Sequence, residues 1–168
     1  KKEGKKTTPV LQIARTPYLA GFQAGWFKFT ICTTHLYYGQ SKADDPQRLA
    51  ETEALAGFLA KEVKRAEAWA RNMVLLGDFN IFSTKDKQFE ALKEAGFKVP
   101  QTLFDTKTNA IGNKPFDQIA FIAPSLTDKL DESKSGVVPV FDQVFKDEDE
   151  SLYAAHMGPG YLKDAKGK

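Results

Sequence analysis

The sequence predicts an α/β fold, and three observations carry this prediction. Strand-like and helix-like segments follow one another in the order strand, strand, long helix, strand, helix, strand. Residues 73–76 are all apolar, which is typical of a strand covered on both faces. The chain has 168 residues, 42% of them hydrophobic, which suffices for one domain with a real core, and no repeat or linker divides it.

The first part of the chain is expected to form strands. Residues 10–15 have the pattern of a strand that ends before Pro17, and extended chain resumes over residues 19–22. Gly25 marks a turn before residues 26–35, which are rich in aromatic and β-branched side chains, as strands are.

A long helix is expected after a loop at residues 37–43. Asp45 is a good N-cap, and Pro46 suits the first helical position, where a missing N–H costs nothing. Apolar residues at spacings of three and four predict the stripe that packs on the sheet. These residues are Leu55, Phe58, Leu59, Val63, Ala66 and Trp69.

The second half of the chain is expected to continue the alternation of strands and helices. After the strand at residues 73–76, a helix is expected over residues 85–95, with Ser83 or Thr84 as its cap. Residues 97–102 and 116–122 have the pattern of two further strands.

Charge and cysteine content exclude several classes of protein. The net charge of +2 favours neither nucleic acid nor a membrane surface. The single cysteine, Cys32, excludes an intramolecular disulfide framework and a cysteine-rich zinc site, and it is expected to be a buried hydrophobe. No apolar run approaches the roughly 18 residues of a membrane span, and no signal peptide is visible, so we expect a soluble protein.

Two features of the C-terminal region are interpreted as structural. The acidic run at residues 147–150 is expected to be a solvated face rather than a metal site. His156 has no acidic neighbour and is a poor catalytic candidate.

The strongest local motif is Gly77-Asp78-Phe79-Asn80, which directly follows the apolar strand. If the chain stays extended there, the side chains of Asp78 and Asn80 point to the same side of the sheet. A carboxylate and a carboxamide in that position could orient a water molecule and hold a phosphate oxygen. In the alternative interpretation Gly-Asp is a turn and Asn80 caps the next segment of the chain.

Four separated segments together resemble the endonuclease/exonuclease/phosphatase superfamily, which includes pancreatic deoxyribonuclease, abasic-site endonucleases, inositol polyphosphate phosphatases and bacterial sphingomyelinases. The segments are Arg15-Thr16-Pro17, Thr34-His35-Leu36, Gly77-Asp78-Phe79-Asn80 and Phe116-Asp117-Gln118-Ile119. They follow one another in family order and with family-like spacing. The resemblance implies a four-layer α/β/β/α sandwich of the deoxyribonuclease-like type.

The chain departs from the family pattern at both ends. In the family, strands carrying an asparagine and a metal-binding glutamate would precede the position of Lys1, and a Ser-Asp-His segment closes the domain; neither occurs here. We therefore expect residues 1–168 to be a single partial domain, the central to C-terminal part of a longer one, and inactive alone. A complete reading frame with the same two ends would contradict this expectation.

The resemblance implies a role for each matching residue. Asp78 would orient or deprotonate the attacking water and is a candidate metal ligand. Asn80 would hydrogen-bond a phosphate oxygen and fix Asp78, and His35 would contact the phosphate or assist proton transfer. Arg15 would bind a phosphate oxygen, and Asp117 would support the site. The implied cofactor is Mg²⁺ or Mn²⁺, with the main glutamate ligand absent from this chain.

Each of these residues also has a structural interpretation. His35 at a strand end could be an ordinary hydrogen-bonded residue, and Arg15 could be a charge that protects an edge strand. Asp117, which follows Pro115, could stabilise a turn.

The leading functional hypothesis is a magnesium-dependent phosphodiesterase of the nuclease type, acting on a phosphate ester such as DNA or RNA. Tyr37-Tyr38 and the basic residues 1–6 would suit stacking on bases and contact with phosphates. The alternatives are a phosphoinositide or phospholipid phosphoesterase and a non-catalytic scaffold of the same fold. An unrelated fold with a fortuitous motif would place Asp78 far from His35.

Overall fold

The computed structural model describes residues 13–104, 106–109, 112–125 and 130–164. The chain divides into two compact units, Lys1–Gly136 and Val137–Lys168, at a position where the sequence pattern shows no linker. Within the described residues, no helix has both the length and the apolar character needed to cross a membrane.

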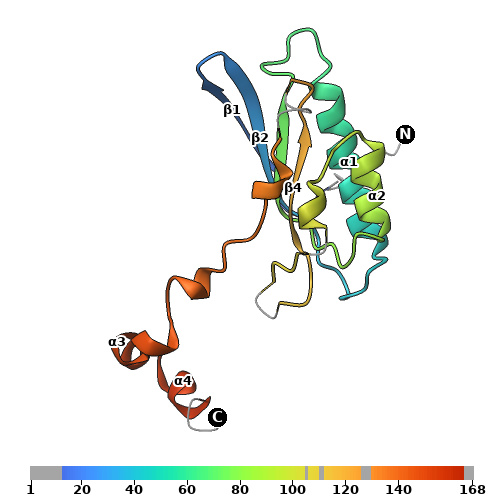
Figure 1. Cartoon of the computed structure of the whole chain (residues 1–168). Coiled ribbons are helices and arrows are strands. Elements are labelled where there is room, and N and C mark those ends of the chain that lie inside the picture. Colours follow the sequence, from blue (N-terminus) through green and yellow to red (C-terminus); the bar gives the residue numbers. More distant parts are fainter. Residues whose placement is uncertain (1–12, 105, 110–111, 126–129, 165–168) are drawn as a thin grey trace, which may run out of the picture. The chain divides into compact units, whose positions relative to one another are not determined.

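The first unit is built on a four-stranded mixed sheet in the order β1-β2-β3-β4 (Figure 1). β1 (Tyr18–Ala24) and β2 (Phe27–His35) form an antiparallel hairpin around Gly25. β3 (Met73–Asp78) runs parallel to β2, and β4 (Asp117–Ile122) runs antiparallel to β3. The α/β fold class is confirmed.

Two helices lie on the same side of the sheet and contact each other (Figure 1). α1 (Pro46–Glu62) makes the crossover that the parallel β2–β3 pair requires. Asp45 caps it as expected, because its Oδ1 accepts hydrogen bonds from the backbone N–H groups of Gln47 and Arg48. α2 (Lys87–Glu94) follows β3.

The hydrophobic core lies between the two helices and one face of the sheet. Cys32, Leu75 and Ala120 are in register across β2, β3 and β4, and each is 0% exposed. Leu55 and Leu59 of α1 belong to the same buried cluster. The expectation that Cys32 is a buried hydrophobe is therefore confirmed.

The opposite face of the sheet is also apolar, but none of its side chains is fully buried. Phe22 stacks on Phe29 with ring centroids 5.5 Å apart, and Phe27 stacks on Phe29 at 5.3 Å. Ile119 on β4 is 40% exposed. We call this surface the open face of the sheet. Its apolar members are Tyr18, Ala20, Phe22, Phe27, Phe29, Ile31, Val74, Leu76, Ile119 and Phe121.

The predicted stripe of α1 is only partly correct. Leu55, Leu59 and Val63 are buried, whereas Phe58 is 51% and Trp69 is 52% exposed. The helix ends at Glu62, so Ala66 and Trp69 lie beyond it. The buried face instead continues toward the N-terminus of the helix through polar residues. These are Arg48, Glu51 and Thr52.

Two predicted strands are wrong within the described residues. Residues 13–15 form a bend, and residues 10–12 of that predicted strand lie outside the described part. In residues 97–102 only Lys98 pairs with β4, as an isolated bridge to Phe121. Pro100 has no N–H to continue a ladder, and a 3₁₀ turn at Gln101–Leu103 follows it.

The start of α2 also differs from the prediction. Its N-cap is Asp86 rather than Ser83 or Thr84. Oδ2 of Asp86 accepts hydrogen bonds from the backbone N–H groups of Phe82 and Ser83, so this carboxylate organises the loop before the helix.

The described residues of the second unit, 137–164, form short helical elements. The longest are α3 (Glu150–Tyr153) and α4 (Pro159–Asp164). The hydroxyl of Tyr153 donates to the backbone oxygen of Phe145, and the hydroxyl of Tyr161 donates to the carboxylate of Glu150.

Gly77 is the position where the sheet tolerates no side chain. Its φ is +138°, and a Cβ there would lie 2.0 Å from the backbone oxygen of Thr34. We expect Gly77→Ala to lower the free energy of unfolding by about 3 kcal/mol or more, because β2 and β3 must separate. Urea denaturation followed by circular dichroism measures this change.

Gly57 provides the matched control for that substitution. It lies inside α1, and a Cβ there would meet nothing within 4 Å. Gly57→Ala should raise stability by about 0.5–1 kcal/mol. Equal stabilities of the Gly77→Ala variant and the unsubstituted protein would contradict the close contact between β2 and β3.

Cys32 supplies a test of the core. Burial raises the pKa of its thiol from an ordinary value of 9.0 to about 11. The folded protein should therefore resist alkylation by iodoacetamide at pH 8 and react only after denaturation. Stability should fall as the pH rises from about 9 to about 11, because the thiol then ionises only in the unfolded chain. Rapid alkylation of the folded protein would contradict this placement.

Candidate functional site

Three titratable side chains stand in one row at one end of the sheet. In the strand register, His35 of β2 pairs with Asp78 of β3, and Asp78 pairs with Asp117 of β4. Residues directly opposite each other on neighbouring strands project to the same face. The row therefore lies on the open face of the sheet, at the carboxyl ends of the parallel strands β2 and β3.

His35 and Asp78 face each other across the parallel pair. Nε2 of His35 lies 3.8 Å from Oδ2 of Asp78, and the two side chains are 51% and 33% exposed. This separation is longer than a hydrogen bond, so each of the two side chains can still bind a further group such as a ligand. An unrelated fold with a fortuitous motif was expected to place these two side chains far apart, and they lie close together.

The chain after Asp78 is a turn rather than extended chain. Asn80 has a φ of +52°, and its backbone N–H donates to Oδ1 of Asp78 at 2.9 Å. The side chain of Asn80 is buried, and its Nδ2 donates to the backbone oxygen of Leu36 at 2.8 Å. The expectation that Asp78 and Asn80 side chains project together from an extended strand is therefore wrong. Asn80 instead holds one oxygen of Asp78 through its backbone.

Arg15 lies at the end of β2, close to the row. Its Nη1 donates to the backbone oxygens of Leu36 at 3.2 Å and of His35 at 3.4 Å. These two bonds use only one of its two terminal nitrogens. Because residues 13–15 form a bend, the interpretation of Arg15 as an edge-strand charge is not supported.

Asp117 is the first residue of β4, so it belongs to the strand and not to the turn before it. Its backbone N–H donates to Oγ1 of Thr108 at 2.8 Å, which fixes the start of the strand. The residue is exposed, and its register partner is Asp78.

Two buried charged residues of α1 were missed by the sequence analysis. Arg48 is 0% exposed and donates to the backbone oxygens of Tyr38, Lys42 and Ala43. Its guanidinium also lies 4.9 Å from the ring centroid of Phe82. Desolvation lowers the pKa of this guanidinium, and the charge of Asp45 opposes that shift.

The second missed residue is Glu51, which is 1% exposed. A signal for both residues was present in the sequence. Counting back from Leu55 in steps of three and four gives positions 52, 51 and 48, which continue the buried stripe. A search for apolar residues at helical spacing does not find these three positions, because all three residues are polar.

Three aromatic side chains from separate segments of the chain form a cluster. It consists of Tyr38, Phe82 and Phe116, whose ring centroids lie 5.1–6.1 Å apart. Phe116 directly precedes Asp117, and the ammonium of Lys114 lies 5.1 Å from the Phe82 ring centroid. Tyr38 is 40% exposed, so part of this cluster is open to a ligand.

The row offers part of a divalent-cation site. Within the described ranges, no group of three or more His, Cys, Asp or Glu side chains could hold a metal ion. Asp78 and Asp117 supply two carboxylates in register, and oxygen ligands are those that Mg²⁺ prefers, in sixfold coordination. The residues present therefore fit a metal site only in part.

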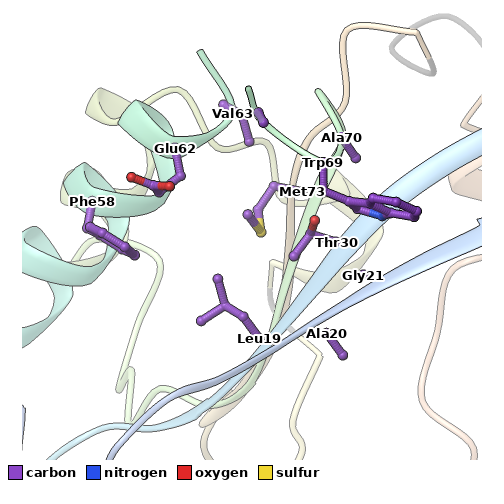
Figure 2. A pocket seen from close by; sticks show the side chains of 11 residues that line it. Leu19, Ala20, Gly21, Thr30, Phe58, Glu62, Val63, Trp69, Ala70 and Met73 are labelled. Carbon is purple, nitrogen blue, oxygen red and sulfur yellow. The ribbon is translucent and has the colours of Figure 1, made fainter. Parts of the chain in front are cut away.

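A separate apolar cavity of about 460 Å³ opens between α1 and the β1–β2 hairpin (Figure 2). Figure 2 shows Phe58 and Glu62 on the helix side and Leu19 and Met73 on the strand side. Met73 opens β3 and Asp78 ends it, so the cavity lies toward the other end of the sheet from the row. Its one charged side chain, Glu62, is paired with Arg65 at 3.1 Å.

Asn80 can be tested by substitution. Asn80→Asp should destabilise the protein by about 2–3 kcal/mol, because a buried carboxylate would face the backbone oxygen of Leu36. Asn80→Gly should cost less, since glycine accepts the positive φ and buries no charge. Thermal and urea unfolding of both variants measure which of the two is less stable. A more stable Asp variant would contradict the Asn80–Leu36 bond.

No protein-family model matches the chain, and no curated protein matches it. Among solved structures, the chain is similar to the crystal structure of a functionally unknown conserved protein from Enterococcus faecalis V583, with 15% sequence identity and a TM-score of 0.44. The match covers 61% of this chain and 42% of that one, so the chain spans about two fifths of that structure's length.

Proposed function

We propose that the chain is part of a metal-dependent phosphoesterase that hydrolyses phosphodiesters and acts as a nuclease. One observation carries this proposal: the strand register places His35, Asp78 and Asp117 in one row on one face. The separated motifs that resemble the endonuclease/exonuclease/phosphatase superfamily meet at this row.

Asp78 is the general base in this proposal. Its Oδ1 accepts the N–H of Asn80, so the carboxylate has a fixed orientation. Its Oδ2, 3.8 Å from Nε2 of His35, accepts a proton from the attacking water. His35 donates a hydrogen bond to the phosphate or protonates the leaving group.

Arg15 contributes the fixed positive charge. Its Nη1 is held by the backbone oxygens at the end of β2, which leaves Nη2 for a phosphate oxygen. Asn80 acts through Asp78 and through the backbone of Leu36 rather than by direct contact with substrate.

Mg²⁺ or Mn²⁺ is the proposed cofactor. Asp78 and Asp117 would hold it together with a glutamate from outside this chain. When bound, a divalent cation polarises the phosphate and neutralises the charge that develops during hydrolysis.

The open face of the sheet supports the finer proposal of a four-layer sandwich. Phe22 and Ile119 are exposed on this side of the sheet among the described residues, and sheets commonly pack face to face about 10 Å apart. A second sheet on this face would place the row at the edge between the two layers. In this proposal the second sheet comes from outside the described residues.

The aromatic cluster favours nucleic acid as the substrate class. Nucleic-acid sites combine aromatic rings for base stacking with positive charge for the backbone. Tyr38 is 40% exposed and belongs to the aromatic cluster in which the ammonium of Lys114 lies over the Phe82 ring.

The test uses the full-length protein that contains this chain, assayed with plasmid DNA and bis(p-nitrophenyl) phosphate. Asp78→Ala should lower kcat by about 10²–10⁴-fold, because the general base is removed. Hydrolysis should also require Mg²⁺ or Mn²⁺ and cease with a chelator. Glu53→Ala, an exposed acid of α1, is the matched control and should leave kcat unchanged. A fully active Asp78→Ala variant would exclude the proposed mechanism.

A further inference from the structure

Glu51 is a carboxylate that the proposed chemistry does not use, yet it is almost completely buried. It is 1% exposed and lies on the side of α1 that faces the sheet. Burying a carboxylate is costly unless its oxygens accept hydrogen bonds, and an apolar residue would fill the same space without that cost. A carboxylate at this position therefore needs a specific reason.

The hydrogen bonds of Glu51 give that reason. Its Oε1 accepts the backbone N–H of Ala14 at 2.9 Å, and its Oε2 accepts the backbone N–H of Tyr37 at 3.0 Å. The side chain of Gln47 also donates to Oε1 at 3.3 Å. One side chain thus satisfies backbone donors in two irregular segments 23 positions apart in the sequence.

Both segments lead directly to the row. Ala14 precedes Arg15, and Tyr37 follows Leu36. The side chain of Arg15 in turn donates to the backbone oxygen of Leu36. The contacts therefore form a closed circuit from Glu51 through Ala14 and Arg15 to Leu36 and back through Tyr37.

We infer that Glu51 is a positioning residue that sets the guanidinium of Arg15 against the end of β2. This inference rests on the proposed function, in which Arg15 contacts the substrate phosphate. Two carboxylate oxygens are required because two backbone donors must be held at once. In glutamine an NH₂ donor replaces one of these two oxygens and would face a backbone N–H, so glutamine in this position can hold only the other N–H.

The way in which substitutions of Glu51 and Arg15 combine in their effect on activity distinguishes positioning of Arg15 from general stabilisation of the fold. If Glu51 acts through Arg15, its loss has little further effect once Arg15 is absent. If Glu51 only stabilises the fold, the effects of the two substitutions on activity are independent.

The experiment is a double-mutant cycle in the full-length protein, with kcat/KM for bis(p-nitrophenyl) phosphate as the readout. Glu51→Gln and Arg15→Ala should each lower kcat/KM by about tenfold to a hundredfold, through misplacement or loss of the cation. The double variant should be no worse than Arg15→Ala. Thr52→Val is the matched control, because Thr52 is buried on the same helix and its hydroxyl donates to the backbone oxygen of Arg48 within that helix.

A second readout does not depend on activity. Hydrogen exchange of the Ala14 or Tyr37 amide should accelerate in Glu51→Gln and remain unchanged in Thr52→Val. Additive losses in the cycle, or exchange at both amides that Glu51→Gln leaves unchanged, would overturn the inference. An unsubstituted protein without hydrolytic activity would instead overturn the proposed function, and the exchange readout would then decide whether Glu51 positions the two segments.

Discussion

The parallel pairing of β2 with β3 is the constraint on which the rest of the structure depends. It brings together two segments more than forty residues apart, and its register alone decides that His35 meets Asp78. A shift by one residue would move His35 to the other face of its strand relative to Asp78. Gly77 keeps this register in place, because the backbone of Thr34 occupies the space where a side chain would stand.

Polar residues on the buried side of α1 fix the positions of the loops. Arg48 holds the backbone oxygens of the loop after β2, and Glu51 holds the backbone N–H groups of Tyr37 in that loop and of Ala14 before β1. Two side chains of opposite charge on one helix thus satisfy backbone N–H and backbone oxygen groups in segments that are neither helix nor strand. The positions of Arg15 and Leu36 follow from this arrangement, since neither lies in a helix or strand.

The sequence was most informative where local chemistry decides the structure. The cap at Asp45, the turn at Gly25 and the strands β2, β3 and β4 follow from side-chain size, turn chemistry and periodicity. The sequence was least informative where contacts between residues far apart in the chain determine the structure. The burial of Glu51 depends on Ala14 and Tyr37, and the positive φ of Asn80 depends on the bond to Leu36. The four-layer sandwich and the chemistry of the row remain proposals.

The exposure of the row bears on its chemistry. His35 and Asp78 are half and one-third exposed, so water screens the electrostatic interaction between the two side chains. Charges act on one another far more strongly when an apolar layer excludes water. The open face that carries the row is apolar along β1, β2, β3 and β4, and a covering sheet would dehydrate the row from that side. The apolar surface that the proposed second sheet would cover is thus also the one whose burial would strengthen the site.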